Sequence, residues 1–402
     1  MTHEESVARN PRLLFWGRAF VEVKALTAVI VLFYLHREVT LEQVYYLSIF
    51  WTIGLVIFEI PSGYLADKIG RQRTLVLAAA SYMVFQTVQF FAHGFSQFIV
   101  VFGLMSFSFA LFSGTEEAML YESLKELGRE NEMTRRNSIQ QSAQTVFKMG
   151  MAIAGGLIAR ELLEYQFRIL IIINITMAVG SLVIFTLLAE PRHRKSLALN
   201  PIEAFRASYH TIRLDPWLLK ASLNKIVIFL AVFISWRVFQ PVLKEGGFSV
   251  VMIGVFDAIS FALIFSGQRY IGQIAKRVGT ARVLFTTTIV VIVGFGLCVV
   301  QTNLWIMFAA LNIGIAAGAS RLPLFAEAIN QRLDSDIRAT TLSSLNMIKG
   351  IIDIPIFVLC GWLVTYDIKH TFVVSIVLCG LALILLPMRE REMNLQPKRP
   401  GT

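Results

Sequence analysis

Residues 63–73 read Gly-Tyr-Leu-Ala-Asp-Lys-Ile-Gly-Arg-Gln-Arg, a short polar stretch between two long apolar ones. The apolar stretches at 41–65 and 74–93 are each long enough to cross a membrane as a helix, which takes about 20 residues. Gly63 and Gly70 carry no side chain that restricts the backbone, so they allow a tight reversal of the chain. The stretch therefore predicts a short turn between two membrane-spanning helices.

The charged residues of this turn are placed to interact. Asp67 can accept hydrogen bonds from Arg71 or Arg73, or it can face the N-terminus of a neighbouring helix. A purely structural interpretation is also open, in which the residues form a salt bridge at a helix end and anchor the turn on the cytoplasmic side.

The turn belongs to a chain that is apolar along most of its length. Of its 402 residues, 55% are hydrophobic and 16% are charged, whereas soluble domains carry about 25% charged residues. This composition excludes a soluble enzyme, a secreted disulfide scaffold and a disordered chain. We predict an all-α membrane protein with twelve spans, at residues 13–35, 41–65, 74–93, 97–121, 138–160, 166–189, 221–243, 249–271, 281–301, 303–327, 338–365 and 369–387.

The basic residues predict the orientation of the spans. With a cytoplasmic N-terminus, the cytoplasmic segments hold 24 Lys and Arg residues and the external segments hold five. Because basic residues collect on the cytoplasmic side, we predict a multi-pass protein of the cell inner (plasma) membrane with both termini inside. Residues 1–12 lack a cleavable signal pattern, so the first span is expected to be retained. The net charge of +10 is accounted for by orientation, and nucleic acid is not expected as a partner.

One connection, residues 191–220, is longer than the others and divides the chain into two six-helix halves, 1–190 and 221–402. Within it, Asn200-Pro201 is typical of an N-cap followed by Pro at the first helical position. Apolar residues then recur at helical spacing opposite two arginines, which predicts an amphipathic helix on the cytoplasmic membrane face. The apolar residues are Ile202, Phe205, Tyr209 and Ile212, and the arginines are Arg206 and Arg213. This helix could serve as a simple tether or in regulation.

The two halves share three motifs in the same order, which predicts a duplicated six-helix unit. The copies are separated by 209, 201 and 204 residues. They are 63–73 with 272–282, Ser142…Lys148 with Ser343…Lys349, and Gly114–Glu117 with Gly318–Arg321. The second copy of the turn lacks the acid, because Ala275 or Lys276 stands where Asp67 would be.

The stretch 63–73 resembles the signature loop of the major facilitator superfamily, Gly-x-Leu-Ala-Asp-Arg-x-Gly-Arg-Lys-x between helices two and three. Twelve spans with a central connection extend the resemblance over nearly the whole chain. It implies two pseudo-symmetric six-helix bundles and a gating loop that latches one half against the other. That loop would comprise Gly63, Asp67, Gly70, Arg71 and Arg73. With no acid in the second copy, the latch is expected to be stronger in the first half.

Two further runs, Phe58–Ser62 and Ser113–Ala118, resemble a bacterial branch of drug or metabolite efflux carriers. The chain departs from proton-linked members of the superfamily at two places. Proton-linked members often carry an arginine midway along helix four, and residues 107–113 of this chain offer none. The antiporter motif of helix five is Gly-Pro-x-x-Gly-Gly, and residues 151–156 keep its closing glycines without its proline. Proton antiport is therefore not decided by the resemblance.

Ionisable residues inside spans cost about 2.5–3.5 kcal/mol on insertion scales, so they usually face a cavity or a partner. Arg18 and Glu22 lie four residues apart, close enough to pair on one helix face. Lys349 and Asp353 repeat this spacing, and we expect them to form a structural pair.

By the internal repeat, Glu117 corresponds to Arg321, and the two could pair across a central cavity or bind a charged substrate. A carboxylate whose surroundings change can load and release a proton. The candidates for substrate or proton binding are Arg18, Glu22, Glu59, Glu116, Glu117, Asp257 and Arg321.

These observations predict a monomeric secondary carrier that works by alternating access. The leading expectation is proton-coupled export of an amphipathic small molecule, a drug or a metabolite. The alternative is an importer or facilitator of a polar metabolite or siderophore. Neither a cofactor nor a metal is expected, because the sequence has no phosphate-binding loop and its six His lie in tails, loops or span ends. For the same reasons an enzyme is not expected.

Overall fold

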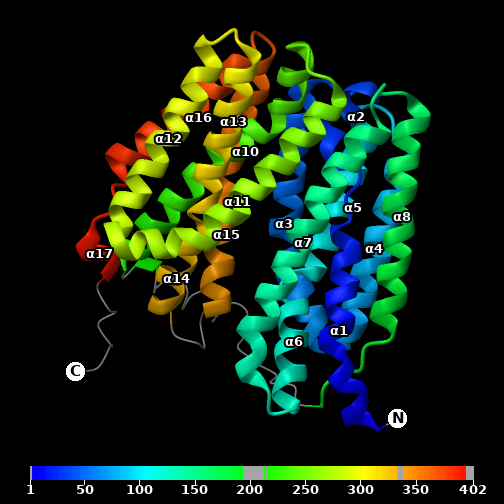
Figure 1. Cartoon of the computed structure of the whole chain (residues 1–402). Helices are drawn as coiled ribbons and strands as arrows, with labels where there is room; N and C mark the ends of the chain where they lie inside the picture. Colours follow the sequence, from blue (N-terminus) through cyan, green and yellow to red (C-terminus); the bar gives the residue numbers. More distant parts are fainter. Residues whose placement is uncertain (1, 193–211, 214, 334–337, 395–402) are drawn as a thin grey trace. The chain divides into compact units, whose positions relative to one another are not determined.

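The computed structural model describes residues 2–192, 212–213, 215–333 and 338–394, and the regular elements of this part of the chain are all helices (Figure 1). The all-α prediction is confirmed. The amphipathic helix predicted from Asn200 onward lies mostly outside the described residues. Of its predicted members only Ile212, which is buried, and Arg213, which is exposed, belong to them.

Contacts divide the chain into two compact units. The first comprises Met1–Leu197 and Phe248–Ala258, and the second comprises Ala198–Gly247 and Ile259–Thr402. The boundaries that we predict at residues 190 and 220 stay a prediction, because much of the connection lies outside the described residues.

In the first unit, α4 packs against α5 and α8, while α1 packs against α8 and α3 against α5 (Figure 1). Apolar side chains from these helices form its core. Its elements are α1 (His3–Glu22), η1 (Thr27–Val29), α2 (Ile30–His36), α3 (Leu41–Ile69), α4 (Arg71–Phe91), α5 (Gly94–Phe112), α6 (Thr115–Glu126), η2 (Glu130–Glu132), α7 (Met133–Ile158) and α8 (Glu164–Thr186).

The second unit repeats three of these four contacts, since α12 packs against α13 and α16, and α10 packs against α16. The recurrence supports the duplication inferred from the motifs. The helices of the second half are α10 (Pro216–Glu245), α11 (Val250–Val278), α12 (Thr280–Val300), α13 (Leu304–Ser320), α14 (Leu322–Arg332), α15 (Arg338–Val364), α16 (Lys369–Leu385) and α17 (Glu390–Asn394). The start of α11 belongs to the first unit.

Ten helical segments of the described chain are long and apolar enough to cross a membrane. Helix α7 covers the fifth predicted span but has a polar first half, and α16 has only 17 residues. The total of twelve spans and the cytoplasmic position of both termini stay predictions.

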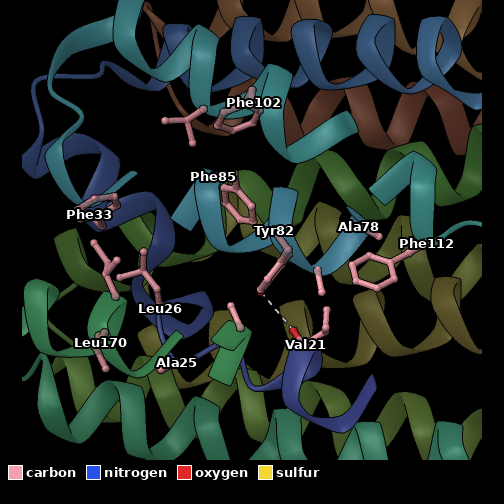
Figure 2. Close-up of a cluster of buried hydrophobic side chains, with 14 of the residues drawn as sticks. Val21, Ala25, Leu26, Phe33, Ala78, Tyr82, Phe85, Phe102, Phe112 and Leu170 are labelled. Carbon is pink, nitrogen blue, oxygen red and sulfur yellow. Dashed lines mark hydrogen bonds between the residues drawn. The ribbon is translucent and has the colours of Figure 1, made fainter. Parts of the chain in front are cut away.

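The first span is not one continuous helix. Helix α1 ends at Glu22, and the chain passes through residues 23–26 before η1 begins. Tyr82 of α4 donates a hydrogen bond of 3.2 Å to the Val21 carbonyl, among the apolar side chains drawn in Figure 2. The Asn174 side chain accepts the Ala25 N–H at 2.8 Å. Since lipid offers no hydrogen bonds, side chains must satisfy the backbone groups that such a break frees.

Two glycine–serine contacts hold helices close together at equivalent places in the two units. A Cβ atom at Gly54 of α3 would lie 2.0 Å from Ser106 Oγ of α5. At Gly267 of α11 it would lie 2.0 Å from Ser320 Oγ of α13. Small residues of this kind allow membrane helices to approach closely.

Candidate functional site

The break in the first span lies beside a buried carboxylate, that of Glu22, of which 2% is exposed. Arg18 Nη2 lies 2.7 Å from Glu22 Oε1, as the spacing of four residues predicts. Lys24 Nζ and Lys148 Nζ lie 3.1 and 3.0 Å from Glu22 Oε2. Lys24 comes from the break and Lys148 from α7, so the carboxylate ties α1 to α7. A buried carboxylate is tolerated when cations compensate its charge in this way.

Arg18 also links Glu22 to a second carboxylate. Arg18 Nη1 lies 3.5 Å from Glu116 Oε2, and the Gln140 amide donates a hydrogen bond to Glu116 Oε1. Three helices therefore meet in one charge network. Sequence reasoning had not linked Glu116 or Lys148 to Arg18 and Glu22, although the repeat had singled out Lys148.

A cavity of about 390 Å³ opens beside this network within the first unit. Among the described residues, twelve line the cavity, and eight of these carry polar or charged side chains. The lining residues are Arg18, Phe109, Phe112, Ser113, Gly114, Glu116, Glu117, Leu120, Asn137, Gln140, Gln141 and Gln144.

The fourth span is also broken, at the cavity wall. Helix α5 ends at Phe112 and α6 begins at Thr115. Gly114 between them has a φ of +72°, a left-handed conformation that glycine adopts without strain. This break places Glu116 and Glu117 in the first turn of α6. Discontinuous helices are typical of substrate sites in secondary transporters.

Two other predicted carboxylates do not line this cavity. Glu59 of α3 is partly buried. Asp257 of α11 is 2% exposed, and its Oδ2 atom has no hydrogen-bond partner among the described residues. In the described part of the chain, no group of three or more His, Cys, Asp or Glu side chains is arranged to hold a metal ion.

In the second unit, Arg321 lies between α13 and α14 and is 2% exposed. Its Nη1 donates to Thr288 Oγ1 at 2.6 Å, and its Nη2 donates to Asn224 Oδ1 at 2.8 Å. The guanidinium also lies over the Phe325 ring, at 5.3 Å from the centroid. These contacts do not test the pairing of Arg321 with Glu117, which is one of the two alternatives that the sequence leaves open.

Lys349 and Asp353 form an ion pair on α15, and Asp353 is buried. The pair resembles the contact of Lys148 with Glu22, because Lys148 and Lys349 are equivalent in the repeat. Each lysine compensates a buried carboxylate of its own unit.

The signature stretch forms a turn of a single residue. Helix α3 continues to Ile69 and α4 begins at Arg71, so only Gly70, with a φ of +103°, reverses the chain. Our expectation for Gly63 is wrong in this respect, because Gly63 lies inside α3. No atom comes within 4 Å of a Cβ atom placed there, so the described packing does not require glycine at this position.

Asp67 pairs with Arg71 rather than with Arg73. Arg71 Nη2 lies 3.0 Å from Asp67 Oδ1 and 3.5 Å from Glu122 Oε1 of α6. Half of the Asp67 side chain is exposed. Arg73 is exposed and has no ion pair or hydrogen bond among the described residues.

A carboxylate that sequence reasoning missed caps the helix after this turn. The Glu190 side chain accepts the N–H groups of Arg71 and Gln72, both at 2.8 Å. In the second unit, Glu390 accepts the N–H groups of Thr280 and Ala281, at 3.1 and 2.8 Å. A negative charge stabilises a helix N-terminus. The separation of 200 residues between the two glutamates, close to that of the other repeats, is the signal that could have identified them.

Helix α17 is attached to α10 by an ion pair between side chains. Lys220 Nζ lies 3.0 Å from Glu392 Oε2. Burial alone would raise the pKa of Glu392, but hydrogen bonds from Lys220 and from the Arg389 N–H lower that pKa below its ordinary value.

Another ionic cluster lies where α2 ends. Arg37 is buried, pairs with Glu164 at 2.7 Å and contacts the His93 ring. Burial lowers the pKa of Arg37, although the Glu164 carboxylate opposes this effect. In the sequence, Arg37 is one of the five basic residues assigned to external segments, and hydropathy gives no sign of its burial.

Comparisons with known proteins agree with this architecture. The model of the Major Facilitator Superfamily matches residues 19–354. No curated protein sequence matches the chain. A variant of the nucleoside transporter NupG is similar in structure, with a TM-score of 0.77 and 13% identity over 96% of this chain and 100% of that one.

Two further solved structures are also similar. A D-xylose-proton symporter has a TM-score of 0.72 and 12% identity over 97% of this chain and 99% of that one. A bacterial homologue of the iron transporter ferroportin, in its inward-facing state, has a TM-score of 0.71 and 16% identity over 96% of this chain and 99% of that one. At these identities the likeness shows the fold. With the family match over most of the sequence, the chain is a membrane transporter of the Major Facilitator Superfamily rather than an enzyme.

Proposed function

We propose that this protein is a secondary active transporter that moves a small solute by alternating access, with the cavity beside Arg18 and Glu116 as a substrate-binding surface. The observation that carries the proposal is the position of this cavity. It lies at the break of the fourth span and includes Arg18 of the first, and it is lined by charged and amide side chains that hydrophobic packing does not require.

The lining favours a polar solute. Among the described lining residues, apolar side chains come from Phe109, Phe112 and Leu120 alone, whereas sites for drug-sized ligands are mostly apolar. Of our two sequence-based expectations, the alternative of a polar metabolite therefore has more support than an amphipathic drug. Export, and membership of an efflux branch, stay predictions.

For proton coupling we propose Asp257 as the proton-binding group. Glu22 already has three cationic partners, and Glu116 has Arg18 and Gln140. Asp257 is buried and has an oxygen atom with no donor among the described residues. A carboxyl group in such a position can exchange a proton without first breaking an ion pair.

The test is solute uptake into proteoliposomes, with and without a pH gradient, after a stabilisation screen on the purified protein has identified a solute. Asp257→Asn should lose accumulation driven by the gradient while it retains exchange of labelled for unlabelled solute. Glu130→Gln, which neutralises an exposed carboxylate of η2, is the control and should keep both activities. Full accumulation by Asp257→Asn would exclude it as the proton site, and absence of flux for every stabilising solute would exclude transport.

A further inference from the structure

One face of α7 carries a row of amide side chains. Asn137, Gln140, Gln141 and Gln144 follow the spacing i, i+3, i+4, i+7, so they lie on one side of the helix, and all four line the cavity. Each amide offers both a donor and an acceptor. Gln140 uses one donor on Glu116. The remaining groups suit a solute that has several hydroxyl or amide groups.

The charged groups of the wall are not balanced. Among the described lining residues, Arg18 is the one cation, and it is held by Glu22 and Glu116. Glu117 follows Glu116 in the first turn of α6 and is exposed. Among the described residues, Glu117 has neither an ion pair nor a hydrogen bond from its side chain. The cavity therefore offers a carboxylate to a solute, while its guanidinium is already engaged.

From these observations we propose that the cavity binds a compact polar amine, a primary or secondary ammonium compound that carries several hydroxyl or amide groups. The ammonium group pairs with Glu117, and the hydroxyl or amide groups bond to the amide face of α7. Phe109, Phe112 and Leu120 contact the carbon skeleton. A volume of about 390 Å³ lies near the lower end for ligand pockets, about 300–1,000 Å³, and suits a small solute. The inference rests on the proposed function, because it identifies the chemical class of the substrate.

The experiment compares three matched classes of probe on the purified full chain, by thermal stabilisation and then by calorimetry. Amino sugars and amino alcohols form the first class, the same skeletons with hydroxyl in place of amine form the second, and their carboxylates form the third. Glucosamine, glucose and glucuronate are one such matched set. We expect binding by members of the amine class, and weaker or no binding by their hydroxyl and carboxylate counterparts.

Glu117→Gln should weaken amine binding by about 10- to 100-fold, as for the loss of a charge-assisted hydrogen bond. Gln144→Leu should weaken binding of the polyhydroxylated amines but not of their deoxy analogues. Glu130→Gln, which removes one exposed negative charge from η2, is the matched control and should leave affinity unchanged. Equal binding of the three classes, no binding by any class, or full amine affinity in Glu117→Gln would each overturn the proposal.

A second measurement tests whether the partner of Glu117 is Arg321 rather than a solute. We expect a double-mutant cycle of Glu117→Gln and Arg321→Gln, read by thermal stability without solute, to show no coupling. A measurable coupling would assign Glu117 to Arg321 and overturn the proposal.

Flux distinguishes this inference from the proposed function. If amines bind through Glu117 but cross no vesicle membrane, transport fails and the binding site stands. If a neutral or anionic solute is transported equally well by the parent and by Glu117→Gln, transport stands and the amine proposal fails.

Discussion

Asp67 is a residue whose loss we expect to affect transport more than stability. Its carboxylate lies 3.0 Å from Arg71, one helical turn away, and half of its side chain is exposed. Exposed ion pairs contribute about 0–1 kcal/mol to folding. The resemblance to the superfamily implies that this carboxylate acts as a latch when the carrier changes conformation.

We therefore expect Asp67→Asn to express and melt nearly as the parent does, because it removes an exposed charge, and to transport the solute much more slowly. Initial rates of uptake into proteoliposomes measure the effect. Lys68→Gln alters the neighbouring exposed charge and should leave the rate close to that of the parent. Parental flux in Asp67→Asn would rule out a gating role for this residue.

At the scale of elements, the features that position charged residues and neighbouring helices are breaks within the spans and close contacts between helices. The first, fourth and tenth spans are interrupted beside Glu22, at Gly114 and at Arg321. In each unit a glycine of one helix faces a serine of another with no room for a further methyl group. The positions of these helices therefore depend on very small side chains.

Gly54→Ala should destabilise the protein by about 1–3 kcal/mol, the usual cost of forcing an extra carbon atom into a packed contact. The new Cβ atom would lie 2.0 Å from Ser106 Oγ and 2.8 Å from Ser106 Cβ, so Ser106→Gly in the same chain should restore part of the loss. Thermal unfolding in one detergent measures both variants.

Gly103→Ala is the matched control, because it lies inside α5 and a Cβ atom there would meet nothing within 4 Å. Its melting temperature should equal or exceed that of the parent. If Gly54→Ala melts like Gly103→Ala, then the close contact between α3 and α5 does not limit stability.

Orientation in the membrane is a property of the whole molecule, and it can be tested with single cysteines. The native residues Cys298, Cys360 and Cys379 are buried, so they should give a low background of labelling. Ser96 and Lys276 are exposed at ends of helices in different units.

With a membrane-impermeant maleimide on intact cells, Ser96→Cys should react at once, and Lys276→Cys should react only after permeabilisation. The uneven distribution of Lys and Arg is the physical reason for this expectation. Complete labelling of both after permeabilisation controls for reactivity. The reverse pattern would mean that the predicted orientation is inverted.

The sequence by itself determined the all-helical membrane architecture and its duplication. Hydropathy, glycine motifs and their repetition are carried by each segment of the chain, so they can be read without knowing which segments touch. It also predicted the contacts of Arg18 with Glu22 and of Lys349 with Asp353, because residues four apart lie on one face of any helix.

Only the tertiary structure decided which helices share a charge. Lys148 and Glu116 join Arg18 and Glu22 from α7 and α6, and no spacing rule relates residues on different helices. The same holds for the turn after α3, where Glu190 caps α4 from 119 residues away. The structure also places Gly63 within a continuous helix, whereas the sequence predicts a turn there. Sequence patterns report local geometry, whereas a buried charge takes its partner from whichever segment the packing of the unit brings near.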